Sequence, residues 1–342
     1  MSTPTKNYQR WAEQTKRSLN VNVQHEYFDI AGLSVCIRLH HHELEEIFLM
    51  AIMHLQIPPC RADYVIDVWD STKGSYSFPA FEHGIDDIAL RGEVPKYSGD
   101  NVNFAYFAHA NMAHILNENE KHGIVAVRDA SKMPRFELAC PFRGIFSWML
   151  RNNKKAIIHS AALADEHGNA YLLLGKSGAG KSTTAISCFL SGMKYIGDDL
   201  CALGLVNQQV HVYSLYSSAK TYRSEWQFLP ELKALAISSP SVYPDKEVYF
   251  FGSMRERTIA SGPLKTIFVP TKNTTIPLDK LPSIASLISE TLDSTREILP
   301  SAGFEALALI YAAFKQAPIQ LLSLRADRTC PIPRNDQLKS FN

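Results

Sequence analysis

The sequence predicts an α/β protein in which a core built on a strand, a glycine-rich loop and a helix follows a smaller α+β module. The stretch "AYLLLGKSGAGKSTTAISCFLSG" (residues 170–192) places these three features in direct succession. Next comes "KYIGDD", a short strand that ends on two carboxylates. Strand-like and helix-like patterns alternate upstream. We therefore expect an α+β module at residues 1–140, a nucleotide-binding domain at 141–330 and a C-terminal tail at 331–342.

The composition is that of a folded protein with little net charge. The chain has 342 residues, 46% of them hydrophobic, and a formal net charge of +1. This length suits about two domains, and the charge gives no general reason to expect nucleic acid or a membrane as partner. Without an apolar leader, or an apolar run near the roughly 20 residues that span a bilayer, we expect a cytoplasmic protein. The six cysteines form no C-x-x-C pair, so we expect reduced thiols.

Apolar spacing predicts the elements of the N-terminal module. The first 20 residues are polar, and we expect a loose arm there. Residues 27–39 alternate as a strand, residues 42–56 have the spacing of an amphipathic helix, and residues 62–71 form another predicted strand. Residues 103–123 fit a strand and a helix equally well, so both interpretations stay open.

The expected nucleotide-binding domain begins with a helix over residues 141–156, which has Pro141 near its first turn and basic residues near its end. Residues 157–175 are expected to form two strands joined by a turn at 165–169. The remaining predicted elements are a strand–turn–strand at 201–215, a short helix within 224–235, a strand at 264–270, helices at 286–294 and 304–316, and a strand at 319–324.

The loop "GKSGAGKS" at residues 175–182 fits the phosphate-binding pattern G-x-x-x-x-G-K-[ST] at every position. Its glycines let backbone N–H groups surround phosphate oxygens, and the N-terminus of the next helix adds partial positive charge. Lys181 would pair with the terminal phosphates, and Ser182 would hold Mg²⁺ through its hydroxyl. We expect ATP and Mg²⁺ to bind at the loop residues Gly175, Ser177, Gly178, Ala179, Gly180, Lys181, Ser182 and Thr183.

The acidic pair Asp198 and Asp199 follows one helix and one short strand after Lys181, so the carboxylates should return beside the phosphates. One of them could hold Mg²⁺ while the other takes a proton from an attacking hydroxyl, which is the usual division in phosphoryl transfer. Adjacent carboxylates also push their pKa values apart, which favours a base role for one of them.

His159 lies at the start of the strand pair that leads into the loop. A single histidine on an apolar strand is commonly a packed, hydrogen-bonded core residue, and a functional role is the alternative.

With His159, the loop and the acidic pair together in residues 157–203, the sequence resembles the HPr kinase/phosphorylase family, which shares a core with the phosphoenolpyruvate carboxykinases. The typical pattern there is an H-x-x-A-like strand, a turn, a strand, a G-x-S-G-x-G-K-S loop, a helix ending in glycine and a DD pair. The order of elements also resembles the family weakly as far as residue 324. The resemblance implies a P-loop fold like the C-terminal domain of HPr kinase, and it does not extend to residues 1–140.

The resemblance also implies roles for individual residues. Asp198 would be the catalytic base that activates an acceptor hydroxyl, and Asp199 would help position Mg²⁺ with Ser182. His159 would be a second catalytic residue, which lies near the γ-phosphate and assists charge balance. The implied activity is an ATP- and Mg²⁺-dependent serine kinase, and hexamers in the family make a homo-oligomer plausible.

One signature of HPr kinases is missing. Residues 211–225 lack the Glu–Arg–Gly-rich motif that is tied to HPr recognition and to the reverse reaction. "LYSSAK" instead resembles divergent members, some of which phosphorylate free serine or a peptide such as a lasso-peptide precursor. Lys220 would then contact phosphate or acceptor, or be a solvated lysine. Arg255 and Arg257 would close over the transferred phosphate, or be surface arginines.

Three functions therefore compete. The leading hypothesis is a kinase that phosphorylates a hydroxyl, on serine by preference, of a peptide, protein or amino acid. The second is a P-loop ATPase, which the absence of an LSGGQ-type signature and of a later apolar Walker B strand disfavours. The third is a nucleotide sensor without an acceptor, which would not need a base at Asp198.

Overall fold

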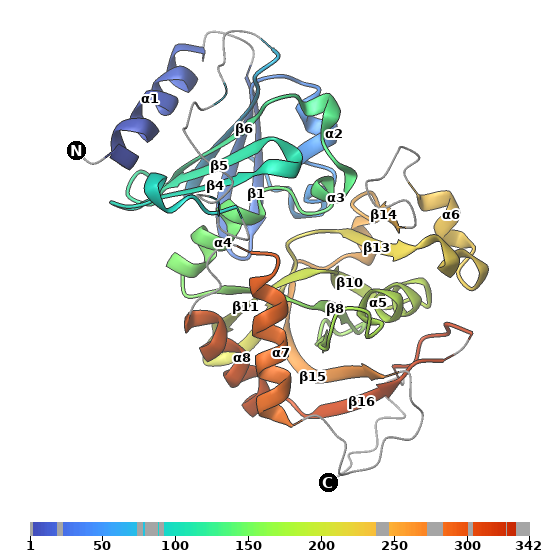
Figure 1. Cartoon of the computed structure of the whole chain (residues 1–342). Helices are drawn as coiled ribbons and strands as arrows, with labels where there is room; N and C mark the ends of the chain where they lie inside the picture. The colour runs from blue at the N-terminus through green and yellow to red at the C-terminus, as the bar shows by residue number, and fades with distance from the viewer. Residues whose placement is uncertain are drawn as a thin grey trace.

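The computed structural model describes residues 3–18, 23–73, 78, 88, 92–236, 246–271, 283–299, 304–325 and 327–332. They form a mixed α/β protein with two large mixed sheets and one small sheet. In Figure 1 the sheet of the N-terminal strands lies above the sheet next to the expected phosphate loop. Most of the predicted tail at 331–342 lies outside the described residues, and the expected division near residue 140 stays a prediction.

The upper sheet has six strands in the order β1-β2-β3-β6-β5-β4. β2, β3 and β6 run parallel to one another, and the outer pairs are antiparallel. The strands are β1 (Gln24–Ile30), β2 (Leu33–Leu39), β3 (Tyr64–Asp70), β4 (Val102–Phe107), β5 (Met112–Asn117) and β6 (His122–Val127). β3 confirms the strand expected at 62–71, and the ambiguous residues 103–123 fall mainly in β4 and β5.

The single strand expected at 27–39 is wrong in one respect, because it is a hairpin of β1 and β2. The two residues between the strands, Ala31 and Gly32, have φ values of 52° and 82°. Two left-handed residues make the tight turn whose twist matches antiparallel strands. Apolar residues alternate without a break through this turn, so the sequence pattern does not reveal the turn.

The expected loose arm at the N-terminus is also wrong. Most of it forms helix α1 (Thr3–Ser18), in which Tyr8 and Trp11 are 0% and 1% exposed. The Trp11 ring packs 5.5 Å from that of Phe104 on β4. Two aromatic residues three positions apart share a helix face. The sequence prediction missed this helix because the residues around the pair are mostly polar.

The helix expected at 42–56 is shorter than predicted. It consists of α2 (Leu44–Phe48), a turn and the 3₁₀ helix η1 (Met53–Leu55). Leu44, Phe48, Ile52 and Leu55 are all buried. The predicted apolar positions are therefore buried at helical spacing, although short helices and a turn replace the continuous helix. Among the described residues, the other short helices of this half are η3 (Pro95–Tyr97), η4 (Ala108–Ala110), η5 (Ala130–Lys132) and α3 (Arg135–Leu138).

The lower sheet has eight strands, with a path β10-β8-β9-β15-β12-β11-β7 and β16 paired to β15. β15 is parallel to β9 and β16, and the other pairs are antiparallel. The strands are β7 (Ala156–His159), β8 (Ala161–Ala164), β9 (Ala170–Leu173), β10 (Lys194–Gly197), β11 (Leu200–Val206), β12 (Gln209–Tyr213), β15 (Ser261–Thr271) and β16 (Ile319–Ser323). Residues 157–175 thus contain three strands instead of two, because the chain leaves β11 after His159 and joins β9 and β10.

Helices cover both faces of the lower sheet. α5 (Lys181–Leu190) packs on β8, while α7 (Ile284–Arg296) and α8 (Phe304–Gln316) contact β7 from the other side (Figure 1). The predicted helix at 141–156 is α4 (Arg143–Asn152), and it contacts both β5 of the upper sheet and β7 of the lower one. A Cβ added to Gly144 of α4 would lie 2.9 Å from Nδ1 of His114 on β5, so this contact needs glycine.

A small sheet flanks the lower one and was not predicted. It pairs β13 (Ser218–Tyr222) with β14 (Lys246–Phe250), next to η6 (Arg223–Gln227), α6 (Glu231–Leu235) and η7 (Arg255–Arg257). Its polar and small residues lack the alternation that predicts a strand. β13 begins near the upper sheet, where the Ser217 N–H donates to the Ala51 carbonyl at 2.7 Å.

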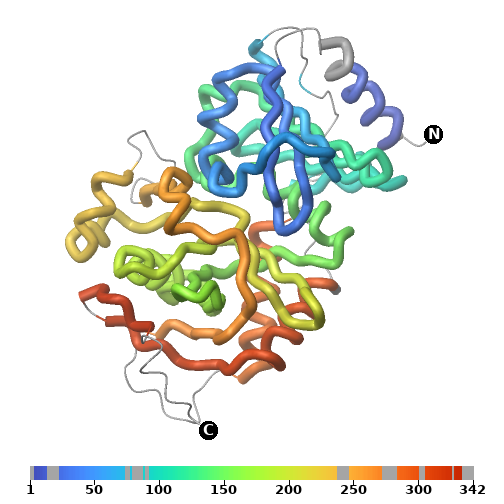
Figure 2. Tube along the Cα trace, turned by 180° about the vertical axis from the view of Figure 1, so that it is seen from behind, coloured from blue at the N-terminus to red at the C-terminus, as the bar shows by residue number. Residues whose placement is uncertain are grey.

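One apolar cluster contains residues of both large sheets, beside further clusters within each half. A continuous cluster of buried side chains runs from β1–β6 through Phe142 and Phe146 to Leu200, Leu215 and Tyr216. Figure 2, seen from behind, shows the N-terminal half seated directly on the other. No helix in the described part of the chain is long and apolar enough to cross a membrane.

The expectation that all cysteines are reduced thiols is wrong for one pair. Cys188 on α5 and Cys330 form a disulfide across a sequence separation of 142 residues. The fold brings the segment 327–332 against the helix, a contact that spacing along the chain cannot reveal. The other cysteines are free, and among them Cys60 is exposed and Cys140 is buried.

Candidate functional site: a glycine-rich loop beside an acidic pair

The phosphate loop connects β9 to α5, as the sequence predicts. Gly178 and Gly180 have φ values of 78° and 101°, which favour glycine. Lys176, Ser177 and Gly178 are exposed at the tip of the loop, whereas Lys181 at the start of α5 is buried. The loop backbone therefore faces solvent at the N-terminus of a ten-residue helix, where N–H groups and the helix dipole attract an anion.

Lys181 is folded back into its own loop. Its Nζ donates to the carbonyl oxygens of Gly175 at 2.8 Å and Lys176 at 3.2 Å. The pKa of Lys181 is lowered, because the effect of burial outweighs the charges of Asp198 and Asp199, which raise it. The ammonium is thus held close to the acidic pair by groups that a phosphate oxygen could replace.

Asp198 lies directly after β10 and reaches the first turn of α5. The Ser182 hydroxyl donates to Oδ1 of Asp198 at 2.9 Å. Asp198 is 2% exposed. Burial, and secondly the negative charge of Asp199, raises the pKa of the Asp198 carboxyl to about 7. This carboxyl can therefore exchange a proton near neutral pH.

Asp199 differs from its neighbour in conformation and in charge. It has a φ of 63°, and the Leu200 N–H donates to the Asp198 carbonyl across it at 2.8 Å, which makes a tight turn of a sparsely populated kind. The turn aims the two carboxylates at different partners. Oδ2 of Asp199 lies 2.7 Å from Nζ of Lys220. Burial raises the pKa of Asp199, but Lys220 and then His159 outweigh it and lower the pKa to about 2.

His159 joins the same cluster from the end of β7, where its backbone is in register with Leu200. Its Nε2 lies 4.0 Å from Oδ1 of Asp199, and its backbone N–H donates to Oγ1 of Thr295 on α7 at 2.9 Å. Burial and the nearby Lys181 charge lower the pKa of His159 to about 4. The imidazole is therefore neutral at physiological pH.

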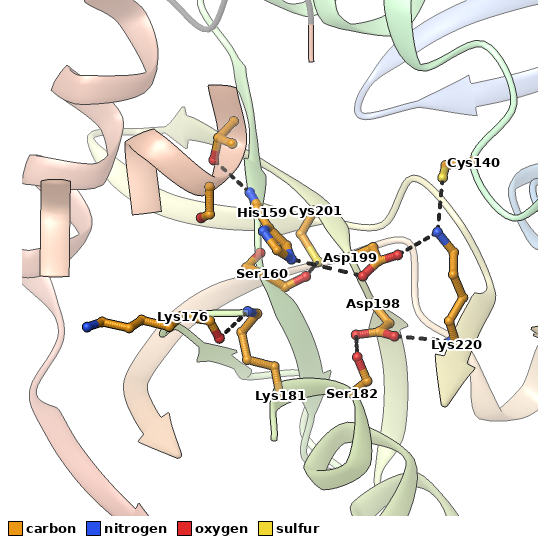
Figure 3. A network of polar contacts seen from close by, with 12 residues as sticks. Cys140, His159, Ser160, Lys176, Lys181, Ser182, Asp198, Asp199, Cys201 and Lys220 are labelled. Carbon is orange, nitrogen blue, oxygen red and sulfur yellow. Dashed lines mark hydrogen bonds and ion pairs between the residues drawn. The ribbon is translucent and has the colours of Figure 1, made fainter. Parts of the chain in front are cut away.

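Lys220 connects the acidic pair to the upper half of the molecule (Figure 3). Besides Asp199, its Nζ contacts the buried Sγ of Cys140 at 3.7 Å, and its backbone N–H points to Oδ2 of Asp198 at 3.4 Å. Burial lowers the pKa of Lys220, but Asp199 and Cys140 outweigh it and raise the pKa. Lys220 is a positioned ammonium and not the solvated lysine that the sequence left open.

The structure uses Arg255 and Arg257 away from this cluster. Arg255 donates to the Met53 carbonyl at 2.9 Å and to Gln56, which ties η7 to the upper half. Arg257 donates to the Phe189 carbonyl and lies 4.2 Å above its ring. Both therefore have packing roles here, and the suggested contact with phosphate stays untested.

Several residues of the cluster were not expected from the sequence. Cys140 and Thr295 come from segments far from the motif along the chain, and they contact Lys220 and His159 only because the fold brings them there. No spacing signal marks such contacts. Asp198, Asp199 and Lys181 carry a signal because one strand–loop–helix unit and the strand that follows place all three.

The residues present suit a magnesium–nucleotide complex. The expected Mg²⁺ ligands, the Ser182 hydroxyl and the Asp199 carboxylate, are hard oxygen donors. Ser182 donates to the neighbouring Asp198, whereas Asp199 is paired with Lys220, so the structure does not bring the two expected ligands into direct contact. No group of three or more histidine, cysteine or acidic side chains is arranged to hold a metal ion among the described residues. Mg²⁺ commonly binds through one or two carboxylates together with substrate phosphates, so this sparse donor set fits.

Comparison with known proteins places the chain in no family. No family model matches it, and no curated protein matches it. Among solved structures, part of the chain is similar to the HPr(Ser) kinase/phosphatase from Coxiella burnetii, with 14% sequence identity and a TM-score of 0.26. The match covers 36% of this chain and 71% of that one. A likeness this distant carries no argument about chemistry, which rests on the site itself.

Proposed function

We propose that this chain is an ATP- and Mg²⁺-dependent kinase that transfers phosphate to a hydroxyl group, by preference that of a serine, on a peptide, a protein or an amino acid. The observation that carries the proposal is the hydrogen bond between Ser182, on the phosphate loop, and the buried Asp198. It joins the place where a terminal phosphate would bind to a carboxyl whose pKa is raised to about 7.

Asp198 would act as the general base. Its Oδ1 accepts from Ser182 at 2.9 Å, whereas Oδ2 accepts a longer contact, at 3.4 Å, from the Lys220 N–H. Oδ2 is therefore the oxygen that would take the acceptor's proton as that hydroxyl oxygen gains the phosphoryl group. A base works best when its pKa is near the working pH, and such catalysis typically contributes about 10²–10⁴-fold.

The surrounding cations would organise the reacting charges. Lys181 would exchange its carbonyl partners in the loop for phosphate oxygens. Lys220 keeps Asp199 ionised, and Asp199 would support Mg²⁺ beside Ser182. His159, neutral and close to Asp199, would help to orient that carboxylate. Bound Mg²⁺ would supply neutralisation of phosphate charge, as in other phosphoryl transfers.

The test is intact-mass spectrometry of an acceptor panel after incubation with the protein, ATP and Mg²⁺. The panel holds free serine, HPr and serine-containing peptides, and Asp198→Asn is the control. We expect a phosphoryl mass gain on one acceptor that falls about 10²-fold or more in Asp198→Asn, while ATP binding changes little. Loss of ATP without any modified acceptor would favour an ATPase, and ATP binding without turnover would favour a sensor. Normal transfer by Asp198→Asn would remove the base assignment.

A further inference from the structure

A cavity of about 380 Å³ lies at the junction of the two halves. Its upper wall is formed by the end of β4 and by η4, with Phe107, Ala108 and His109. Cys140 and Lys220 are also in its lining. Because Lys220 contacts Asp199, the cavity adjoins the acidic pair on a side that the upper sheet covers.

A buried ion pair forms part of the cavity wall. Arg143 donates to Glu137, whose side chain is 2% exposed, and His109 Nε2 lies 2.6 Å from the other Glu137 oxygen. Burial raises the pKa of Glu137, but Arg143 and then His109 lower it to about 2. The wall therefore holds a permanent negative charge next to a permanent positive one.

Arg143 is not fully used by the residues around it. Its side chain is 9% exposed, and its guanidinium lies 4.3 Å above the Phe107 ring. Within the described residues, Nε of Arg143 has no hydrogen-bond partner. That nitrogen is sealed from solvent, so a ligand in the cavity would meet another part of the Arg143 side chain. Lys220, which contacts Asp199, adds a second cation to the lining.

The size of the cavity limits what it can hold. Small-molecule sites typically span about 300–1,000 Å³, so this one is near the lower limit. Its lining mixes aromatic side chains with a few charged ones, as in sites that fix the orientation of a small polar ligand.

We infer that this cavity is the acceptor site and that it takes a small zwitterionic hydroxyl compound of the amino-acid type. A ligand carboxylate would face Arg143, a ligand ammonium would face Glu137, and the hydroxyl would lie at the Lys220 side of the cavity, since Lys220 is the lining residue that contacts the acidic pair. The inference rests on the proposed kinase activity and names the class of its acceptor. It also gives the N-terminal half a task, since Phe107, Ala108 and His109 would close the site over the acceptor.

The direct test is binding of L-serine to the wild-type protein without nucleotide, measured by calorimetry. Ethanolamine, which lacks the carboxylate, and glycerate, which lacks the ammonium, are the comparison ligands. We expect L-serine to bind and each comparison ligand to bind at least about tenfold more weakly, because a site built for both charges leaves one unpaired. Equal binding of all three, or no binding of L-serine, would overturn the inference.

Ala108→Trp locates the binding. Ala108 is an exposed residue in the cavity lining, and the indole would fill the space. Ala234→Trp is the matched control, because Ala234 is exposed on α6 and is not part of the lining. We expect Ala108→Trp to weaken L-serine binding, and to raise its KM, at least about tenfold with an unchanged KM for ATP. Serine binding unaffected by Ala108→Trp would exclude this cavity.

Two further outcomes separate the inference from the kinase proposal. If Ala108→Trp does not fold, His109→Ala serves instead, since it removes a half-exposed contact to Glu137, and we expect it to weaken serine binding several-fold. Phosphorylation of HPr or of a peptide, but not of any free amino acid, would overturn the inference and leave the kinase intact. Serine binding lost in Ala108→Trp, without phosphate transfer to any acceptor, would support the cavity as a binding site and sink the kinase.

Discussion

The hydroxyl of Ser182 donates a hydrogen bond of 2.9 Å to Oδ1 of Asp198, a residue 16 positions further along the chain. The helix α5 and the strand β10 lie between them, so the contact joins the beginning of one element to the end of the next. Its effect is to hold a nearly fully buried carboxyl at the base of a solvent-facing phosphate loop. This arrangement leads to expectations that can be measured separately for the nucleotide, the base and its neighbour.

Lys181→Ala should weaken nucleotide binding strongly. The ammonium is the buried cation of the loop, and its charge-assisted hydrogen bonds to phosphate would each be worth about 1.5–3 kcal/mol. We therefore expect ATP affinity, measured by calorimetry, to fall at least about tenfold. The matched control is Lys176→Ala in the same loop, where the side chain is 75% exposed and only pairs loosely with Glu290. Equal losses in both variants would contradict a specific role for Lys181.

The rate of phosphate transfer should rise with pH and level off above about 7. The base is active as the carboxylate, and the pKa of Asp198 is raised to about 7 by burial and by Asp199. Below that value kcat/KM should therefore fall about tenfold for each pH unit. Titration of His159 would not produce this fall in kcat/KM near pH 7, since the pKa of His159 is lowered to about 4. A pH profile without a limb between 6 and 8 would count against Asp198 as the base.

Asp199→Asn should move that limb to lower pH. The negative charge of Asp199 is one cause of the raised pKa of Asp198, so its removal stabilises the ionised form of Asp198. The pH at which kcat/KM levels off can be read from the rates of this variant relative to its own maximum, even if the variant binds Mg²⁺ more weakly. Asn keeps the size of the side chain at a position whose φ of 63° asparagine also tolerates. An unchanged or higher limb would show that the two carboxyls do not titrate as a coupled pair.

The strand–loop–helix unit could be predicted because each of its signals is local. The glycine spacing, Lys181 and the acidic pair follow one another within one element or the next, and backbone geometry alone brings them together. The ambiguity of residues 103–123 had a different origin. Their strands are buried on both faces, as in β5, where every residue is buried. Such strands lose the alternation that distinguishes them from helices.

The cavity between the two halves and the contacts of Lys220 could not be predicted, because they join distant segments. Lys220 meets Cys140 only when β13 packs against the segment after α3, and Arg143 meets Phe107 only when α4 packs under the upper sheet. A charged residue such as Glu137 carries no mark in the sequence that it will be buried. α1 was missed for a related reason, since its two buried aromatics are outnumbered by polar neighbours.

The Cys188–Cys330 disulfide should stabilise the helix that begins at the phosphate loop. It joins α5 to the segment 327–332, and a cross-link over so long a stretch of chain restricts the unfolded state, with a typical effect of about 2–4 kcal/mol. We expect Cys330→Ser to lower the Tm in non-reducing buffer, and reductant to lower the wild-type Tm to nearly the same value. Cys60→Ser, at an exposed free thiol, is the matched control and should change nothing.

The same experiment bears on where the protein works. Glutathione and thioredoxin keep most cytosolic thiols reduced, so the expected cytoplasmic location and the disulfide oppose each other. Thiol counting by mass spectrometry on protein alkylated at lysis decides between them. Alkylation of Cys188 and Cys330 at lysis would mean a reduced pair that closes only on oxidation. A protected pair would contradict the cytoplasmic expectation, or require a disulfide that resists the thiol pool.

If neither reductant nor Cys330→Ser moves the Tm, the cross-link contributes nothing to α5.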